Sequence, residues 1–467
     1  MTTTSDLTKG AEAASADMSG TAGNTVQTCP RVTLEIGVFF DGTGNNTANS
    51  IEGGDSGSYG NARSNVSLLH EIYKIGDRWT ELADCGSPKT KFSHIYKEGI
   101  GTTSGGWDYN PFTLTGAATG MGPEGVEARV YQACLDVGKE IDRLSPLEEP
   151  EEIVLDVFGF SRGAAAARYF VNCFRQGYVE YDAYYANRKR ARLPEDRNVR
   201  IRYIGIFDTV AAVGDGKDDD NGAVNVHVSS AQCERIYHLT AQNEYRENFR
   251  LNDNQPGGGE VRRLPGAHSD VGGGYRDPGD RTVVAPTRTR VFGSREQAET
   301  ARSTAIQTAE LARSSREAFW VSEGWIRPNE PRGGFVNTPG PVTMQRAHGV
   351  LGSSLRTYTF EEGERLDRPW VQPGLSRIPL RIMYEDAKKA GVPLLAFPAT
   401  AAEYTVPPEL EALAPGMAQG GPTPPPAQTR EILRNFGHVS SNYGKIGMSP
   451  DKNFERVVYP NEPGKAK

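Results

Sequence analysis

The sequence predicts an α/β fold in which a mostly parallel central sheet is flanked by helices. The first observation behind this prediction is the segment EEIVLDVFGFSRGAAAARYFVNCF (residues 151–174), where an apolar run passes through a glycine-flanked serine into small, helix-forming residues. A short apolar run with β-branched residues is typical of a parallel strand that is buried on both faces. Residues 32–40 and 199–207 have the same character, and each is followed by an aspartate. We therefore expect three strands of one sheet.

The turn after residues 153–158 carries the pattern G-x-S-x-G around Ser161. A serine in a sharp strand-to-helix turn takes unusual backbone angles, and the residues two positions away must lack bulk so that strand and helix can approach. Gly159 and Gly163 meet that requirement. The pattern therefore predicts a nucleophile elbow with Ser161 as the nucleophile. The alternative is an ordinary glycine-rich turn in a chain with 53 glycines.

Charge and hydropathy exclude several classes of function. The chain has 467 residues and a net charge of −7 with both signs interspersed, so no basic stripe predicts a nucleic-acid partner. It has neither an apolar run of about 18 residues nor a classical signal peptide, and we expect a soluble protein. The cysteines are odd in number and widely spaced, which predicts free thiols rather than disulfides or a zinc site. They are Cys29, Cys85, Cys134, Cys173 and Cys233.

Composition also divides the chain into parts. Residues 1–30 hold almost no large apolar side chains and cannot offset the entropy of ordering, which predicts a flexible tail. The expected order is that tail (1–30), a catalytic core (31–280), an insertion or cap (281–350), a helical segment that completes the core (351–400), a Pro/Gly-rich linker or loop (401–428) and a C-terminal segment (429–467). Residues 65–79 and 124–144 have helical spacing, and 99–125 are expected to be mostly loop.

A catalytic serine needs a base, and a neutral imidazole suits that role near neutral pH. Of the seven histidines, His268 alone lies in a glycine-dense loop after a strand candidate (residues 261–264). Asp208 follows the strand 199–207 and is the expected carboxylate, because the chain order serine, acid, histidine is that of α/β-hydrolases. His438 is the alternative base, and Asp270 is the alternative acid.

An acyl-transfer site also needs backbone N–H groups aimed at the developing oxyanion. One donor is expected from Arg162, the residue after the nucleophile. A second is expected from Gly42 or Thr43 in the loop DGTGNN that follows residues 32–40. The alternatives for this loop are a tight turn or a phosphate-cradling loop, although it lacks the lysine and the helix placement of a P-loop.

The sequence predicts no metal or other cofactor. The acidic segment DGKDDDNG (residues 215–222) clusters carboxylates as a calcium loop does. Its spacing differs from the twelve-residue calcium-loop pattern, so a solvated acidic loop is expected and calcium is not indicated.

Five segments together resemble bacterial type VI secretion lipase effectors. They are FFDGTGNN (39–46), GAATGMG (116–122), FGFSRGAAAAR (158–168), FDTVAAVG (207–214) and PGAHSDVGGGY (265–275), and residues 375–391 match more loosely. The resemblance implies an α/β-hydrolase-like domain with phospholipase A activity and a triad of Ser161, Asp208 and His268. It also implies a toxin made in the bacterial cytoplasm, delivered by a spike or tube component to the membranes of target cells, and neutralised in the producer by an immunity protein.

The sequence thus predicts a serine esterase that cleaves the acyl esters of glycerophospholipids. The alternatives are a carboxylesterase for small soluble esters and a non-catalytic scaffold that keeps the hydrolase fold. Aromatic residues among the glycines of 99–122, Trp107 and Phe112 above all, suit contact with a membrane interface. The alternative is that these rings pack onto the core.

Overall fold

The computed structural model describes residues 32–462 except 77–88, 109–110, 146–149, 183–187, 194–197, 215–220, 223, 332, 338 and 349–353. The expected tail (1–30) and most of the acidic segment (215–220) lie outside the described residues, as do Cys29 and Cys85. The other three cysteines are buried and free.

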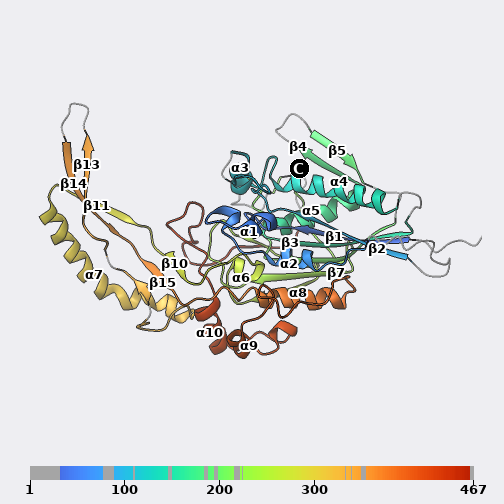
Figure 1. The fold of residues 1–467 in the computed structure, drawn as a ribbon. Coiled ribbons are helices and arrows are strands. Elements are labelled where there is room, and N and C mark those ends of the chain that lie inside the picture. The colour runs from blue at the N-terminus through green and yellow to red at the C-terminus, as the bar shows by residue number, and fades with distance from the viewer. Residues whose placement is uncertain are drawn as a thin grey trace, which may run out of the picture.

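The central sheet has six strands among the described residues, in the order β2-β1-β3-β6-β7-β9, and every neighbouring pair is parallel (Figure 1). The strands are β1 (Val32–Phe40), β2 (Lys89–Lys97), β3 (Glu152–Phe160), β6 (Val199–Phe207), β7 (Arg235–Ala241) and β9 (Glu260–Leu264). The three strands expected from apolar runs, β1, β3 and β6, are adjacent in this order. The predicted α/β fold with a parallel central sheet is therefore confirmed.

Helices cover both faces of this sheet. On one face lie α4 (Val126–Leu144) and α5 (Arg162–Gln176), and on the other lie α2 (Asn65–Glu71) and α8 (Arg377–Lys389) (Figure 1). Each pair closes a separate apolar core against the strands. Helix α2 is shorter than the expected 65–79, because Ile72 already leaves helical geometry.

The C-terminal third adds further layers to the α8 side. The segment 401–428, expected as a linker or loop, contains α9 (Pro408–Leu413) and the start of α10 (Pro426–Phe436). Both helices begin at a proline, which the first helical turn tolerates because its N–H groups lack an intrahelical partner anyway. Leu410 and Ile432 are fully buried in the same core as α8. These residues are thus part of the packed body.

An arm extends away from the sheet between residues 280 and 368 (Figure 1). Its longest element is α7 (Arg295–Ser322), which lies along the antiparallel sheet β11-β14-β13. The arm strands are β10 (Asp280–Val283), β11 (Arg288–Phe292), β12 (Gly334–Val336), β13 (Thr343–His348), β14 (Ser354–Glu362) and β15 (Arg365–Arg368). In the described part of the chain, no helix combines the length and apolar character needed to cross a bilayer.

The remaining elements are short and lie around the body. They are α1 (Thr47–Glu52), α3 (Pro111–Thr119), α6 (His268–Gly272), β4 (Tyr178–Asp182), β5 (Arg188–Arg192), β8 (Leu251–Asn252), β16 (Val458–Tyr459) and the 3-10 turns Gly57–Tyr59 and Met417–Gln419. Helix α3 stands inside 99–125, the segment expected to be mostly loop.

The start of α5 lies in direct backbone contact with its neighbours. A Cβ atom on Gly163 would stand 2.3 Å from the carbonyl oxygens of Phe40 and Asp41, and one on Gly159 would stand 2.4 Å from the carbonyl oxygen of Gly163. Backbone atoms cannot move aside as a flexible side chain can. Glycine is therefore required at both positions for β1, β3 and α5 to meet.

We expect Gly163→Ala to destabilise the protein by about 1–3 kcal/mol, the usual range for overpacking a tight site. Gly138→Ala in α4 is the matched control, because a Cβ there has no heavy atom within 4 Å. Removing a helical glycine should stabilise by roughly 0.5–1 kcal/mol. Chemical denaturation of both variants measures the difference, and equal stability of the two would contradict the close-approach argument.

Candidate active site

Ser161 lies between β3 and α5 in a strained conformation. Its φ is 58° and its ψ is −126°, a region that residues with a side chain rarely occupy. Its N–H donates to the carbonyl of Phe207 at 3.1 Å, and its carbonyl accepts from the N–H of Val210 at 3.4 Å. Ser161 is buried, at 3% exposure. These two hydrogen bonds fix the elbow against the end of β6 and the turn after it. That turn contains Asp208.

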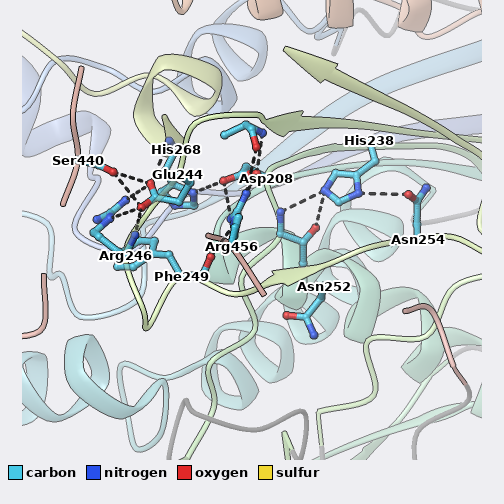
Figure 2. Close-up of polar contacts among 12 residues, drawn as sticks. Asp208, His238, Glu244, Arg246, Phe249, Asn252, Asn254, His268, Ser440 and Arg456 are labelled. Atoms are coloured by element: carbon cyan, nitrogen blue, oxygen red, sulfur yellow. Dashed lines mark hydrogen bonds and ion pairs between the residues drawn. The ribbon is translucent and has the colours of Figure 1, made fainter. Parts of the chain in front are cut away.

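Asp208 pairs with His268 beside this elbow. Its Oδ2 lies 2.6 Å from Nδ1 of His268, and its Oδ1 accepts the N–H of Ala241 at 2.8 Å (Figure 2). Asp208 is fully buried and has a φ of 42°. The parallel order of β6, β7 and β9 brings these segments together, because carboxyl ends of parallel strands share one edge of the sheet.

Arg456 from the C-terminal segment completes the environment of Asp208. Its Nη1 lies 2.7 Å from Oδ1 and its Nη2 lies 2.9 Å from Oδ2. Burial alone would raise the pKa of Asp208, but Arg456 and then His268 outweigh it and hold that pKa well below its usual range. Asp208 is therefore ionised at neutral pH.

His268 begins α6 and lies against the elbow through aromatic contacts. Its ring centroid is 4.6 Å from that of Phe160, the neighbour of Ser161, and 5.0 Å from that of Phe249. Gly272 lets α6 approach, since a Cβ there would stand 2.0 Å from the Phe160 ring. Burial lowers the pKa of His268 below its usual value, and the bond to Asp208 counteracts part of that effect. The imidazole is therefore neutral at pH 7, the form that a general base needs.

A second ionic network supports the same helix. Glu244 is 1% exposed and accepts from the His268 N–H at 3.2 Å, from both Arg246 and Ser440 side chains, and from the Arg246 N–H (Figure 2). Arg246 in turn lies over the Phe249 ring, 3.2 Å from its centroid. The backbone and ring of His268 are thus held independently of Asp208.

The alternative base and acid pair with each other. His438 Nδ1 lies 2.8 Å from Asp270 Oδ1, and the His438 N–H donates to Oδ2 at 2.9 Å. Asp270 also accepts the N–H of Ala267 at 2.9 Å, so it braces its own loop. Tyr275 stacks on His438 with centroids 3.8 Å apart. Among the described residues there are thus two buried Asp–His pairs near this edge of the sheet. The pair that includes Asp208 lies beside the elbow, because the His268 ring packs against Phe160 next to Ser161.

The expected oxyanion donors differ in their availability. The Gly42 N–H donates to Asp41 Oδ1 at 2.7 Å and is engaged. The Thr43 N–H has no hydrogen-bond partner within the described part of the chain. The Arg162 N–H stands in the first turn of α5, where N–H groups lack an intrahelical partner. Thr43 and Arg162 are also linked, because Arg162 Nε donates to Thr43 Oγ1 at 2.8 Å.

The two aromatic candidates for membrane contact, Trp107 and Phe112, lie before and within α3. Trp107 lies in the loop before α3 and is 67% exposed. It is therefore a surface ring and not part of the core. Phe112 lies in α3, but its side chain is outside the described residues.

The sequence alone does not identify several residues of the site. Arg456 stands beside the short apolar run 457–459 with no catalytic motif around it, and Glu244 and Arg246 follow β7 without glycine or an apolar run to mark them. Each acts only through contacts with residues far away in the chain. A carboxylate directly after a strand end, as in the segment after β7, is the one weak indication for Glu244.

Comparison with known proteins adds to this geometry. Residues 178–289 match the family described as "T6SS, Phospholipase effector Tle1-like, catalytic domain". This match confirms the resemblance to type VI secretion lipase effectors. The matched range contains Asp208 and His268, whereas Ser161 lies before it.

One solved structure supports the same fold. The Tle1 effector bound to the VgrG spike from the type 6 secretion system aligns with a TM-score of 0.65 and 21% identity, over 92% of this chain and 94% of that chain. An uncharacterized protein from Pseudomonas aeruginosa aligns at a TM-score of 0.40 and 17% identity, over 87% of this chain and 53% of that chain, and carries no argument. No curated protein matches the sequence.

The two Asp–His pairs predict opposite phenotypes. We expect His268→Ala to lower the rate of ester hydrolysis on the order of 10⁴-fold, because members of a triad act as a unit. His438→Ala should cost much less activity but lower the melting temperature, since it leaves the buried Asp270 carboxylate without its ring partner. Rates and thermal unfolding of both variants test this. If His438→Ala is inactive and His268→Ala is active, His438 is the base and the assignment to His268 is wrong.

Proposed function

We propose that the protein is a serine esterase that cleaves acyl esters of glycerophospholipids, with Ser161 as nucleophile, His268 as base and Asp208 as acid. The observation that carries this proposal is the 2.6 Å contact between Asp208 and His268, with the His268 ring against Phe160 of the strained elbow. A buried acid, a neutral imidazole and a serine at a sharp strand-to-helix turn are the components of that chemistry.

The proposed reaction proceeds in two stages. His268 Nε2 takes the proton of Ser161 as Oγ attacks the ester carbonyl, and Asp208 stabilises the imidazolium through Nδ1. The N–H groups of Arg162 and Thr43 are the proposed donors to the oxyanion. Collapse of the intermediate releases the lysolipid, whose oxygen takes the proton from His268, and leaves an acyl ester on Ser161. Water, deprotonated by His268, then releases the fatty acid and restores the serine.

The phospholipid substrate and the biological setting are proposed from the comparisons. The family matched over residues 178–289 is one of phospholipase effectors, and the Tle1 effector of the aligned structure is bound to a VgrG spike. By analogy we propose export by a type VI system through a spike component, action on membranes of target cells and an immunity protein in the producer. The exposed Trp107 is the proposed contact with the head-group layer.

Purified protein with mixed phospholipid vesicles, and products identified by mass, tests the proposal. We expect lysophospholipid and free fatty acid from the parent and a loss on the order of 10⁴-fold in Ser161→Ala, whose fold should be intact because the smaller side chain relieves strain. If the protein hydrolyses short soluble esters but leaves the vesicle phospholipids uncleaved, a carboxylesterase is favoured. No hydrolysis of either ester would favour a non-catalytic scaffold.

Trp107→Ser should lower the rate on vesicles far more than the rate on a short-chain soluble ester, because only the first requires contact with the bilayer. Leu311→Ser is the matched control, since Leu311 is 87% exposed and lies on α7 in the arm. Equal losses on both substrates would contradict a membrane role for Trp107.

A further inference from the structure

Arg456 makes the most extensive contact of any side chain with the proposed catalytic acid. Its two terminal nitrogens each meet a different oxygen of Asp208, at 2.7 and 2.9 Å, and Nε donates to the Phe249 carbonyl at 2.7 Å (Figure 2). The Arg456 side chain is only 8% exposed. A bidentate, buried guanidinium fixes the plane of a carboxylate as well as its charge.

The backbone around Arg456 is anchored separately. Two residues later, β16 pairs in parallel with β8, and two residues earlier the Phe454 ring contacts Tyr245, Phe319 and Trp320. The segment that carries Arg456 is therefore held against the body by contacts other than the ion pair with Asp208. This arrangement allows the role of the charge and the role of the docking to be separated by mutation.

The ion pair fixes the plane of the Asp208 carboxylate, because Arg456 contacts both of its oxygens. Oδ1 also accepts the N–H of Ala241, and Oδ2 faces Nδ1 of His268. Bound in this way, the carboxylate cannot rotate without breaking two contacts. The His268 tautomer with hydrogen on Nδ1 is then favoured, and Nε2 is left to accept the serine proton.

The same pair offsets part of the negative charge that acts on the imidazole. The charged groups around His268 are Asp208 and Glu244, which favour the imidazolium, and Arg246, which disfavours it. Glu244 and Arg246 form their own ion pair. The Arg456 cation on the far side of Asp208 partly cancels the negative charge that stabilises the His268 imidazolium. His268 is therefore a weaker base than it would be if Asp208 had no cationic partner.

We propose that Arg456 is a positioning residue of the catalytic site, which orients Asp208 toward His268 and moderates the charge that His268 experiences. The proposal rests on the proposed function, in that Asp208 and His268 must be the acid and the base. It also makes the C-terminal segment part of the active site rather than an appendage.

The test is the pH dependence of kcat/KM on a soluble ester for Arg456→Met and Arg456→Lys. We expect Arg456→Met to lower kcat roughly 10- to 100-fold through misorientation of the acid. The acidic limb of its profile should move to higher pH by about one unit, because an opposite charge close to Asp208 has been removed. Arg456→Lys should keep the limb near that of the parent and recover only part of kcat, since an ammonium cannot bind both oxygens.

Two variants in the same segment serve as controls. Phe454→Ala weakens docking of the segment without touching Asp208, and Glu455→Gln changes an exposed neighbour and should leave activity unchanged. If Arg456→Met and Phe454→Ala lose the same activity with no movement of the limb, Arg456 only anchors the segment and the proposal is wrong. An unimpaired Arg456→Met would also overturn it.

The proposed function fails in a different way. If the Asp208→Asn and His268→Ala variants are active, the proposed triad is wrong. Inactive variants at those two positions, combined with an unshifted Arg456→Met profile, would leave the triad standing and refute only the role of Arg456.

Discussion

The site depends on how the buried carboxylate of Asp208 is compensated. A carboxylate in the core is strongly unfavourable unless ion pairs and hydrogen bonds satisfy it, and removing one partner of a buried pair typically costs about 3–5 kcal/mol. Its partners come from three separate places in the chain: the N–H of Ala241 at the end of β7, His268 at the start of α6, and Arg456 near the C-terminus. The parallel sheet brings the first two to one edge, and the pairing of β16 with β8 brings the third.

Helix α6 links this network to the rest of the body. Its first residue is His268, and its third, Asp270, is bound to His438, which follows α10. The second Asp–His pair therefore ties the helix that carries His268 to the C-terminal helices. On its other side the helix lies against Phe160, where Gly272 permits the approach. The position of His268 is thus set by packing on both sides and not by Asp208 alone.

Local patterns in the sequence were enough to predict the centre of the fold. Strands β1, β3 and β6 are apolar runs because both faces are covered, and the elbow is marked by two glycines at which a Cβ atom would meet backbone atoms. Strand β2 (KTKFSHIYK) was missed because it lies at the edge of the sheet and many of its side chains are only partly buried. Strand β7 (RIYHLTA) was missed because its buried His238 is satisfied by the Thr209 N–H, a contact between distant residues.

The same distinction applies to the site. Ser161, Asp208 and His268 follow strands or stand in glycine-dense turns, so their neighbours along the chain identify them as candidates. Arg456 and the pairing of Asp270 with His438 depend on contacts between segments 168 or more positions apart. Such contacts leave no periodicity or spacing in a single sequence. Proline density likewise predicted a linker where α9 and α10 use proline at their first turns.

The most direct test of the proposed triad is covalent labelling with a fluorophosphonate, followed by peptide mass mapping of the parent and of His268→Ala. We expect a single adduct on Ser161 in the parent and greatly slowed labelling in the variant, since the probe reacts readily only with a serine that a base has activated. Lipid hydrolysis by a protein that carries no label on Ser161, or an adduct at another residue that blocks activity, would contradict it.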